Sequence, residues 1–352
     1  MIYLNTGTPG AGKTMNTIKM VCEDSAFYNR PIYYNNIKAL VLDIDFLNSF
    51  EGFFYAKYLN EASEEEKLKV KETVESVHKQ KRLVRMDDVP FLGAEYNEYN
   101  WLDTFVYWCE RLYGSKRVQD LKRYIELCES HGHKIRAKQI RRFNLDWRKI
   151  EDPLKWYTLP AGSVIVIDEI QDFFGKRSPS SKTPEHISEF NTHRHKGYDL
   201  VLITQDSILI DYQIKACVNT HIHYKNLHGG EKVSRIENGG HFNTSSSSEK
   251  KNADRRTVIK RDKKFYGSYY SAELHTQKYR MPSELKKLFW AVPFLLFGVW
   301  WVVSAFDDLN FIADINKNEK VILESANIKE KEQIYENNKN CIILGSGVNY
   351  CI

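Results

Sequence analysis

The sequence has few cysteines, and most of them are not spaced as pairs. Four of the six lie before residue 288: Cys22, Cys109, Cys128 and Cys217. Their spacing excludes a disulfide framework in this part and predicts buried thiols in a reducing compartment. Cys128 has His131 and His133 close in sequence, but a fourth ligand is missing, so no zinc site is predicted. Internal repeats are also missing, which excludes a solenoid or propeller.

One stretch of the chain has no charged residue at all. Residues 288–306 contain no Asp, Glu, Lys or Arg, and as a helix they would extend about 28 Å, close to the thickness of a bilayer's hydrocarbon core. Lipid-embedded helices tolerate residues such as Pro293 and Gly298, and Trp290, Trp300 and Trp301 suit the interfaces. The stretch predicts a transmembrane helix, and it lies too far from the N-terminus to be a signal peptide.

The charges on either side of this stretch differ in sign. Twelve Lys or Arg lie between Lys250 and Lys287, whereas residues 307–352 carry five Lys against eight Asp or Glu. Because basic flanks remain on the cytoplasmic side, the N-terminal part is predicted to be cytoplasmic and the tail, residues 307–352, periplasmic. Attraction to anionic lipid and the orientation in the membrane are enough to explain the basic flank, so it does not by itself indicate nucleic-acid binding.

A glycine-rich motif follows the apolar start of the chain. Gly7 to Thr14 read Gly-Thr-Pro-Gly-Ala-Gly-Lys-Thr, between a predicted strand and a predicted helix over 15–21. This is a P-loop, whose backbone N–H groups surround phosphate while Lys13 contacts the β- and γ-oxygens and Thr14 binds Mg²⁺. ATP and Mg²⁺ are the predicted ligands, and the predicted nucleotide-binding residues are Gly7, Thr8, Pro9, Gly10, Ala11, Gly12, Lys13 and Thr14.

A second motif supplies the acids that such a loop requires. Ser163 is followed by four apolar residues, 164–167, and then by Asp168 and Glu169. Such an apolar run is expected of a parallel strand buried on both faces. Ligands bind at the carboxyl ends of such strands. Asp168 is therefore predicted to hold Mg²⁺ through a water molecule and Glu169 to polarise the attacking water.

Two further polar groups lie around the next predicted strand, residues 199–203. Gln205 follows that strand and would either sense the γ-phosphate or simply cap the strand. The basic cluster of residues 193–197 precedes it, and Arg194 is a candidate for contact with phosphate or with a neighbouring subunit. An exposed basic helix end is the alternative interpretation of that cluster.

A long stretch, residues 44–143, separates the two motifs and is predicted to be a helical insertion. Ser63 with Glu66 is a capping-box signature, and helices are predicted over 102–113 and 118–130. Their larger apolar residues are expected to pack the insertion on the core: Phe105, Trp108, Leu112, Leu121, Tyr124 and Leu127. Five basic residues follow within residues 133–142. They would either track a phosphate backbone or form a solvated helix face, and the lack of interleaved aromatic residues favours the second.

Two strands are predicted ahead of the uncharged stretch, over residues 257–260 and 265–271, because both segments are rich in β-branched or aromatic residues. They are expected to close the cytoplasmic domain near the membrane.

Several segments together resemble the zonula occludens toxin (Zot)-like family, which includes the gene I assembly proteins of filamentous bacteriophages. The resemblance covers roughly residues 1–43 and 144–283. It rests on Trp147–Pro153, Ser163–Gln171, Pro184–His186, His193–His195, Gly197, Asp199, Ile203–Gln205 and Ser271–Thr276. It implies an α/β P-loop ATPase domain in the host cytoplasm, anchored in the inner membrane, that drives assembly and extrusion of phage particles.

The resemblance and the motifs also imply partners. A P-loop site is commonly completed by a neighbouring subunit, so a homo-oligomeric ring is expected. Coat proteins, the packaged single-stranded DNA complex and an outer-membrane channel are the other expected partners, and Cys341 and Cys351 of the tail are predicted to form a disulfide in the periplasm. Two alternatives stay open: a membrane scaffold or gate that binds nucleotide without turnover, and a DNA translocase.

Overall fold

The fold is taken from a computed structural model of the chain. It describes the backbone except at residues 179, 228–229, 271–282, 340, 345–347 and 352, and additionally omits the side chains of 283–286, 288, 305–313, 334–339, 341–344 and 348–351. The chain divides into two compact units, Met1–Arg280 and Met281–Ile352, which are considered separately.

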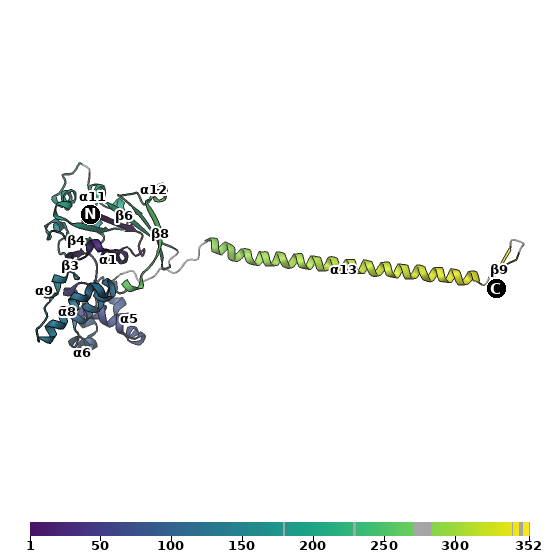
Figure 1. Ribbon diagram of the computed structural model, residues 1–352, viewed down its shortest axis with the longest axis horizontal. Helices are drawn as coiled ribbons and strands as arrows, with labels where there is room; N and C mark the ends of the chain where they lie inside the picture. The colour runs from purple at the N-terminus through teal and green to yellow at the C-terminus, as the bar shows by residue number, and fades with distance from the viewer. Residues whose placement is uncertain (179, 228–229, 271–282, 340, 345–347, 352) are drawn as a thin grey trace. The chain divides into compact units, whose positions relative to one another are not determined.

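A mostly parallel sheet organises the first unit (Figure 1). Among the described residues it has eight strands in the order β3-β2-β4-β5-β1-β6-β7-β8. The first six in this order run parallel, and β7 and β8 extend the sheet as an antiparallel meander. The strands are β1 Ile2–Gly7, β2 Ile32–Asn35, β3 Trp147–Lys149, β4 Val164–Ile167, β5 Asp199–Ile203, β6 Thr220–Asn226, β7 Lys232–Asn238 and β8 Arg255–Lys260.

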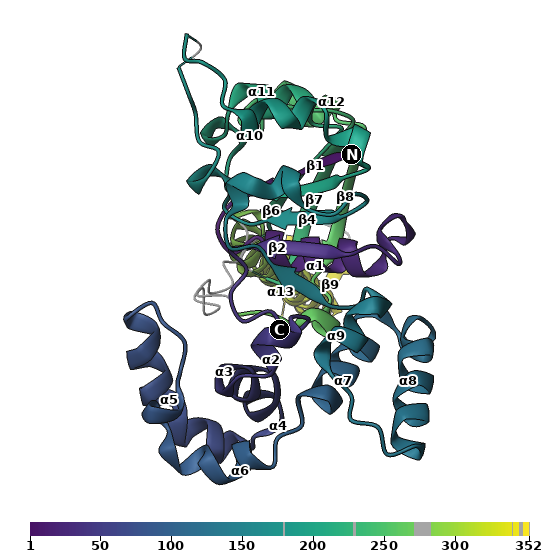
Figure 2. The same ribbon diagram turned by 90° about the vertical axis from the view of Figure 1, so that its left-hand side faces the viewer.

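The central strands are buried on both faces, as their apolar runs predict. Residues of β4 and β5 alternate between two hydrophobic clusters: Val164 and Val201 pack on one face, Ile165 and Leu200 on the other. The first face is covered by α1 (Lys13–Glu23) and the insertion (Figure 2). The second is covered by segments that lie between β3 and β4 or that follow β4 and β5. These segments are η6 Pro153–Thr158, η7 Ile170–Asp172, α10 Glu185–Ser188, η8 Glu189–Asn191, η9 His193–Lys196, η10 Ser207–Leu209 and α11 Tyr212–Cys217.

Residues 44–143 fold as helices on the α1 side of the sheet (Figure 2). The capping box of Ser63 and Glu66 is confirmed at the start of α5, and the two longer predicted helices are confirmed as α7 and α8. The elements here are α2 Ile44–Leu47, α3 Phe50–Gly52, η2 Phe53–Tyr58, α4 Leu59–Glu61, α5 Glu64–Lys79, η3 Met86–Asp88, η4 Pro90–Leu92, α6 Gly93–Asn97, α7 Trp101–Tyr113, α8 Ser115–Ser130, α9 Ala137–Ile140 and η5 Arg141–Phe143.

The insertion packs on the core of the first unit through large side chains. Phe105, Trp108 and Leu112 of α7 are fully buried and join the cluster that also contains residues of α1 and β4. Leu127 of α8 was expected to contribute but is 58% exposed. The basic segment 133–142 forms only the short helix α9 and part of η5, and Arg141 within it pairs with Asp45 at 2.5 Å.

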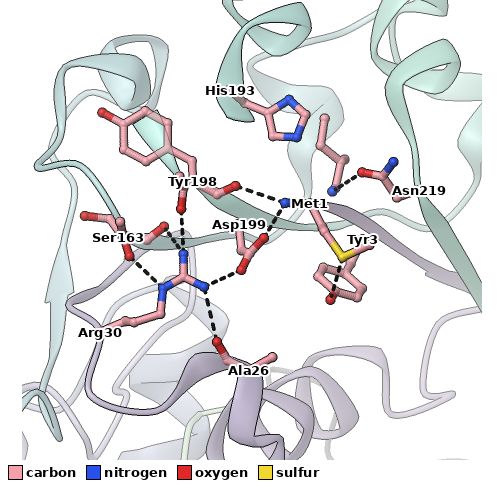
Figure 3. Close-up of polar contacts among 12 residues, drawn as sticks. Met1, Tyr3, Ala26, Arg30, Ser163, His193, Tyr198, Asp199 and Asn219 are labelled. Atoms are coloured by element: carbon pink, nitrogen blue, oxygen red, sulfur yellow. Dashed lines mark hydrogen bonds and ion pairs between the residues drawn. The ribbon is translucent and has the colours of Figure 1, made fainter. Parts of the chain in front are cut away.

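One polar network fastens the end of the sheet at which β5 begins (Figure 3). The Arg30 guanidinium forms an ion pair with Asp199 at the start of β5 and donates hydrogen bonds to the carbonyls of Ala26, Gly162, Ser163 and Gly197. The α-amino group of Met1 pairs with the other carboxylate oxygen of Asp199. This network joins the N-terminal ends of β1, β4 and β5. It therefore fixes the relative positions of three strands whose C-terminal ends carry the predicted site.

Within its described residues the first unit has three further elements: η1 Ser25–Phe27, α12 Ser247–Asn252 and η11 Lys263–Phe265.

The two strands predicted before the second unit have different outcomes. The strand predicted over 257–260 is confirmed within β8, but the strand predicted over 265–271 is wrong through Tyr270, and Ser271 lies outside the described residues. Phe265 instead ends η11 and is buried in the cluster beneath α1 and α7.

The second unit consists of the helix α13 (Ser283–Lys339) and a hairpin of β9 (Cys341–Leu344) and β10 (Val348–Cys351). Within the part of the chain that the structure describes, no helix is both long and apolar enough to cross a membrane. Leu288, Ala305 and Phe306 of the predicted span lie outside the described side chains, as do Cys341 and Cys351. The backbone register of the hairpin places these two cysteines opposite each other.

Candidate nucleotide site

The loop between β1 and α1 has the backbone of a phosphate cradle. Gly10 and Gly12 have φ values of 69° and 79°, a region that glycine enters without the clash a Cβ would cause. Gly12 is the residue before α1, which begins at Lys13. The first N–H groups of a helix have no acceptor within the helix, so this loop directs free donors and the positive end of the helix dipole to one place.

Gly7 is needed for a different reason. A Cβ built on it would lie 2.2 Å from the carbonyl oxygen of Tyr224 in the adjacent strand β6, far inside any real contact. Only a residue without a side chain allows β1 and β6 to stay paired up to the point where the loop begins. Thr8, Pro9 and Ala11 complete the loop, and the Ala11 N–H donates to the Thr8 carbonyl at 3.1 Å.

The structure brings the two motifs together. The Thr14 hydroxyl donates a hydrogen bond to a carboxylate oxygen of Asp168 at 2.7 Å, although the residues are 154 positions apart. Lys13 and Asp168 are each only 8% exposed. Burial raises the pKa of the Asp168 carboxyl to about 6, and the bond from Thr14, the Glu169 N–H and the charge of Lys13 act in the opposite direction.

Glu169 stands at the end of β4 in an unusual conformation. Its φ of 47° lies in the left-handed region, which costs a non-glycine residue of order 1 kcal/mol or more. The N–H of Glu169 donates to the Asp168 carboxylate at 2.9 Å. Its own carboxylate accepts hydrogen bonds from Gln171 at 2.6 Å and from Gln205 at 3.5 Å, so the strained turn presents the Glu169 side chain between two amides.

Gln205 lies where its position after β5 predicts, beside the acids and the loop. Its carbonyl oxygen accepts a hydrogen bond from the Gly7 N–H at 3.2 Å. Its long, weak contact with Glu169 and its exposed side chain leave the amide available for another partner. Lys13, Thr14, Asp168, Glu169 and Gln205 therefore gather at one edge of the sheet, where β1, β4 and β5 end.

Arg194 is not brought to this site. It lies in η9, before β5, and is exposed, whereas Gln205 follows the end of the same strand. A five-residue strand separates the two positions by roughly 17 Å. Contact of Arg194 with phosphate in its own subunit does not fit this position, because the direction of β5 places Arg194 at the opposite end of that strand. Contact with a neighbouring subunit stays a prediction.

The sequence interpretation missed two residues that support Glu169. Gln171 bonds Glu169 through its amide nitrogen and accepts from the Thr204 hydroxyl at 2.7 Å through its oxygen. It thereby joins the ends of β4 and β5. The position of Gln171, two residues after the acid, was visible in the sequence, but a pairing with Thr204 across 33 residues had no local signal.

These residues fit a magnesium nucleotide. A hydroxyl and a buried carboxylate oxygen 2.7 Å apart are the ligand types that Mg²⁺ takes from a P-loop protein. The glycines leave the loop open to phosphate. Burial raises the pKa of the Asp168 carboxyl, and a cation bound beside it would favour its ionised form. Lys13 and Thr14 would hold phosphate and metal, and Asp168 would hold the metal.

Comparison with known proteins agrees with the predicted resemblance. Residues 116–276 match the family model "Zonular occludens toxin (Zot)", and the chain is Zot-like over this range. A stretch of 137 residues is 33% identical to the assembly protein ORF301 of Pseudomonas phage Pf3. That match covers 38% of this chain and 45% of ORF301, so the chain spans less than half of this relative's length.

Two solved structures are also similar. The N-terminal domain of zonular occludens toxin from Neisseria meningitidis has 21% identity and a TM-score of 0.42, over 76% of this chain and 98% of that one. The DNA-packaging ATPase B204 from Sulfolobus turreted icosahedral virus has 11% identity and a TM-score of 0.31, over 74% and 96% of the two chains. The fold assignment rests on the sheet and the phosphate loop described above.

Proposed function

We propose that this chain is an inner-membrane ATPase that powers the assembly and extrusion of filamentous phage particles. The hydrogen bond between Thr14 and Asp168 is the observation that carries the ATPase part. It joins a complete phosphate loop to a buried acid, with Glu169 directly beside them. A scaffold that bound nucleotide without turnover would have no need of a strained, hydrogen-bonded Glu169 at this place.

Each residue has a defined task in this proposal. Bound Mg-ATP supplies the transferable phosphate and a cation that neutralises its charge. The loop N–H groups and Lys13 hold the phosphates, and Thr14 and Asp168 hold the cation. Glu169 orients and polarises water, and the hydrogen bond from Gln171 holds its carboxylate in place. Gln205 is exposed beside Glu169 and would sense whether a γ-phosphate is present.

Oligomerisation is part of the proposal because Arg194 lies at the opposite end of β5 from the nucleotide site of its own subunit. Charge that develops during phosphoryl transfer is commonly stabilised by an arginine, which a neighbouring molecule often supplies. Arg194 is exposed at the far edge of the sheet, so it would reach a nucleotide only in another subunit. A homo-oligomeric ring is the arrangement that repeats such a contact around a closed assembly.

The membrane part of the proposal rests on residues 288–306. They carry no charge and lie within the continuous helix α13. Their described apolar side chains are exposed, including Phe289 at 72% and Trp301 at 64%, and an exposed apolar surface of this size needs a partner. A bilayer would supply it, with the first unit in the cytoplasm and residues 307–352 in the periplasm.

The similarity to the Zot family and to the assembly protein of phage Pf3 supports the link to phage assembly. Coat proteins, the single-stranded DNA complex and an outer-membrane channel are the proposed partners. The test is complementation of a phage that lacks this gene with Lys13→Ala. Particle release is expected to stop while the amount of protein in the membrane fraction stays unchanged, and normal release would refute the proposal.

Orientation has its own test. Protease added to spheroplasts is expected to remove the tail and leave the first unit intact, whereas a protected tail would contradict the topology. Thiol labelling before and after reduction tests the disulfide, since Cys341 and Cys351 are opposite each other in the hairpin. Labelling without reductant would show that they are not joined.

A further inference from the structure

The phosphate loop has a consequence for its carbonyl groups. When the N–H groups of such a loop turn inward to phosphate, neighbouring carbonyl oxygens turn outward and need donors of their own. The Gly12 carbonyl accepts from the Asn16 side chain at 2.8 Å. The Gly10 carbonyl accepts from the guanidinium of Arg261, a residue 251 positions away, just beyond β8.

Arg261 is held in place from several sides. Its own N–H donates to the Glu231 carbonyl at 2.9 Å. The next residue, Asp262, forms an ion pair with Lys19 of α1 at 2.5 Å, and Lys264 pairs with Glu23 near the end of the same helix at 3.0 Å. Two ion pairs thus hold the segment that carries Arg261 against α1, the helix that begins at the end of the phosphate loop.

Arg111 fixes the same segment from the insertion. The Arg111 guanidinium of α7 donates to the carbonyls of Lys264 and Lys263 at 2.9 and 3.3 Å. Phe265, the next residue, is only 1% exposed and is buried in the cluster shared by α1 and α7. Arg261 therefore approaches the loop from a support that is anchored on two helices.

The contact also limits what the loop can accommodate. A Cβ built on Gly12 would lie 3.3 Å from the Asn16 amide nitrogen and 3.8 Å from Nε of Arg261. These two side chains therefore pack against the outside of the loop at the place where its φ angle is positive. They form a rim beside Gly12, on the same side of the loop as the carbonyls that they contact.

We infer that Arg261 is a positioning residue of the nucleotide site. It holds the Gly10 carbonyl outward, so that the adjacent N–H groups stay turned to the phosphates of ATP. This inference rests on the proposed function, since it assigns Arg261 to the same site. Without Arg261 the Gly10 peptide is free to rotate, and the loop must be reordered each time nucleotide binds, which weakens binding without changing the chemical step.

The experiment compares Arg261→Ala with wild type in the purified full-length chain. A hydrogen bond to a charged group corresponds to about a tenfold change in equilibrium. The Kd of a fluorescent ATP analogue and the KM for ATP are expected to rise about tenfold, and kcat to stay within about twofold. Arg256→Ala is the matched control, because Arg256 is an exposed arginine on β8, and it should behave as wild type.

Arg261→Lys keeps one donor, and its Kd is expected to lie between those of wild type and Arg261→Ala. If Arg261→Ala folds poorly, the Kd of the lysine variant for the ATP analogue still tests the inference. Without nucleotide, the thermal midpoint of the lysine variant is expected to match that of wild type.

Failure of the inference is distinguishable from failure of the proposed function. If wild type and Arg256→Ala bind no nucleotide, the proposed function itself falls, and the inference falls with it. If both bind and Arg261→Ala or Arg261→Lys binds as tightly as wild type, only the inference is overturned. A drop in kcat at unchanged KM would also overturn it, since Arg261 would then act on the transferring phosphate.

Discussion

Replacing Asp168 with asparagine is expected to stabilise the nucleotide-free protein at alkaline pH. The pKa of this carboxyl is about 6 in the folded chain, raised chiefly by burial, against 3.8 as its ordinary value. Because the folded state binds the proton more tightly than the unfolded state, stability falls as the pH rises from about 4 to about 6. Above pH 6 the loss is about 2 pKa units, or roughly 3 kcal/mol.

Asparagine removes this loss because it has no charge to bury. Its oxygen can keep the bond from the Glu169 N–H, and its amide can donate to the Thr14 oxygen, so the polar contacts of the site survive. The gain is expected to be about 3 kcal/mol at pH 8 and well under 1 kcal/mol at pH 4. For a unit of this size, 3 kcal/mol corresponds to roughly 5 to 10 °C in the thermal midpoint.

The assay is thermal unfolding of the full chain, followed by tryptophan fluorescence, with a chelator present at both pH values. Asp172→Asn is the control, because Asp172 is an exposed acid close to the same turn; its midpoint should change little at either pH. A lower midpoint for Asp168→Asn at pH 8, or an equal gain at both pH values, would refute the reasoning. It would mean that the buried charge is compensated in the folded protein.

Three further changes have defined outcomes. Glu169→Gln is expected to keep nucleotide bound but lower phosphate release by about a hundredfold or more. Nucleotide retained by the protein on a desalting column measures binding, and a wild-type rate of phosphate release in the variant would place the base elsewhere. Gly7→Ala forces a Cβ to within 2.2 Å of a β6 carbonyl, so its thermal midpoint should fall while that of Gly93→Ala, which meets no neighbour, should not. Arg30→Ala removes one of the two cationic partners of Asp199 and the donor to four backbone carbonyls. It is expected to cost about 1 to 3 kcal/mol of unfolding free energy, against little for the exposed Arg123→Ala, and equal midpoints would contradict the structural role of the Figure 3 network.

The parts of the fold that sequence could predict are those with short-range causes. The phosphate loop, the buried strands and the capping box of Ser63 each depend on residues within a few positions of one another. The strand predicted over 265–271 failed because aromatic and β-branched residues favour any half-buried surface, not only a sheet. Phe265 found its burial against α1 and α7 instead.

The parts of the site that escaped prediction depend on which strand ends meet. The positions of Gln171 and Thr204 in the sequence were known, but their bond exists only because β4 and β5 are neighbours. Arg261 has no local signature at all, since the antiparallel strands β7 and β8 carry it back to the phosphate loop. Arg194 was misplaced for the same reason, because the direction of β5 was not used.

The central claim is that the chain hydrolyses ATP at the loop of residues 7–14. Steady-state phosphate release by the purified full-length protein, with Lys13→Ala beside wild type, tests it most directly. We expect Mg²⁺-dependent release by wild type and a loss of about a hundredfold or more in the variant, because Lys13 is the buried cation of the loop. Release at the same rate from both proteins, or none from wild type in its assembled form, would contradict it.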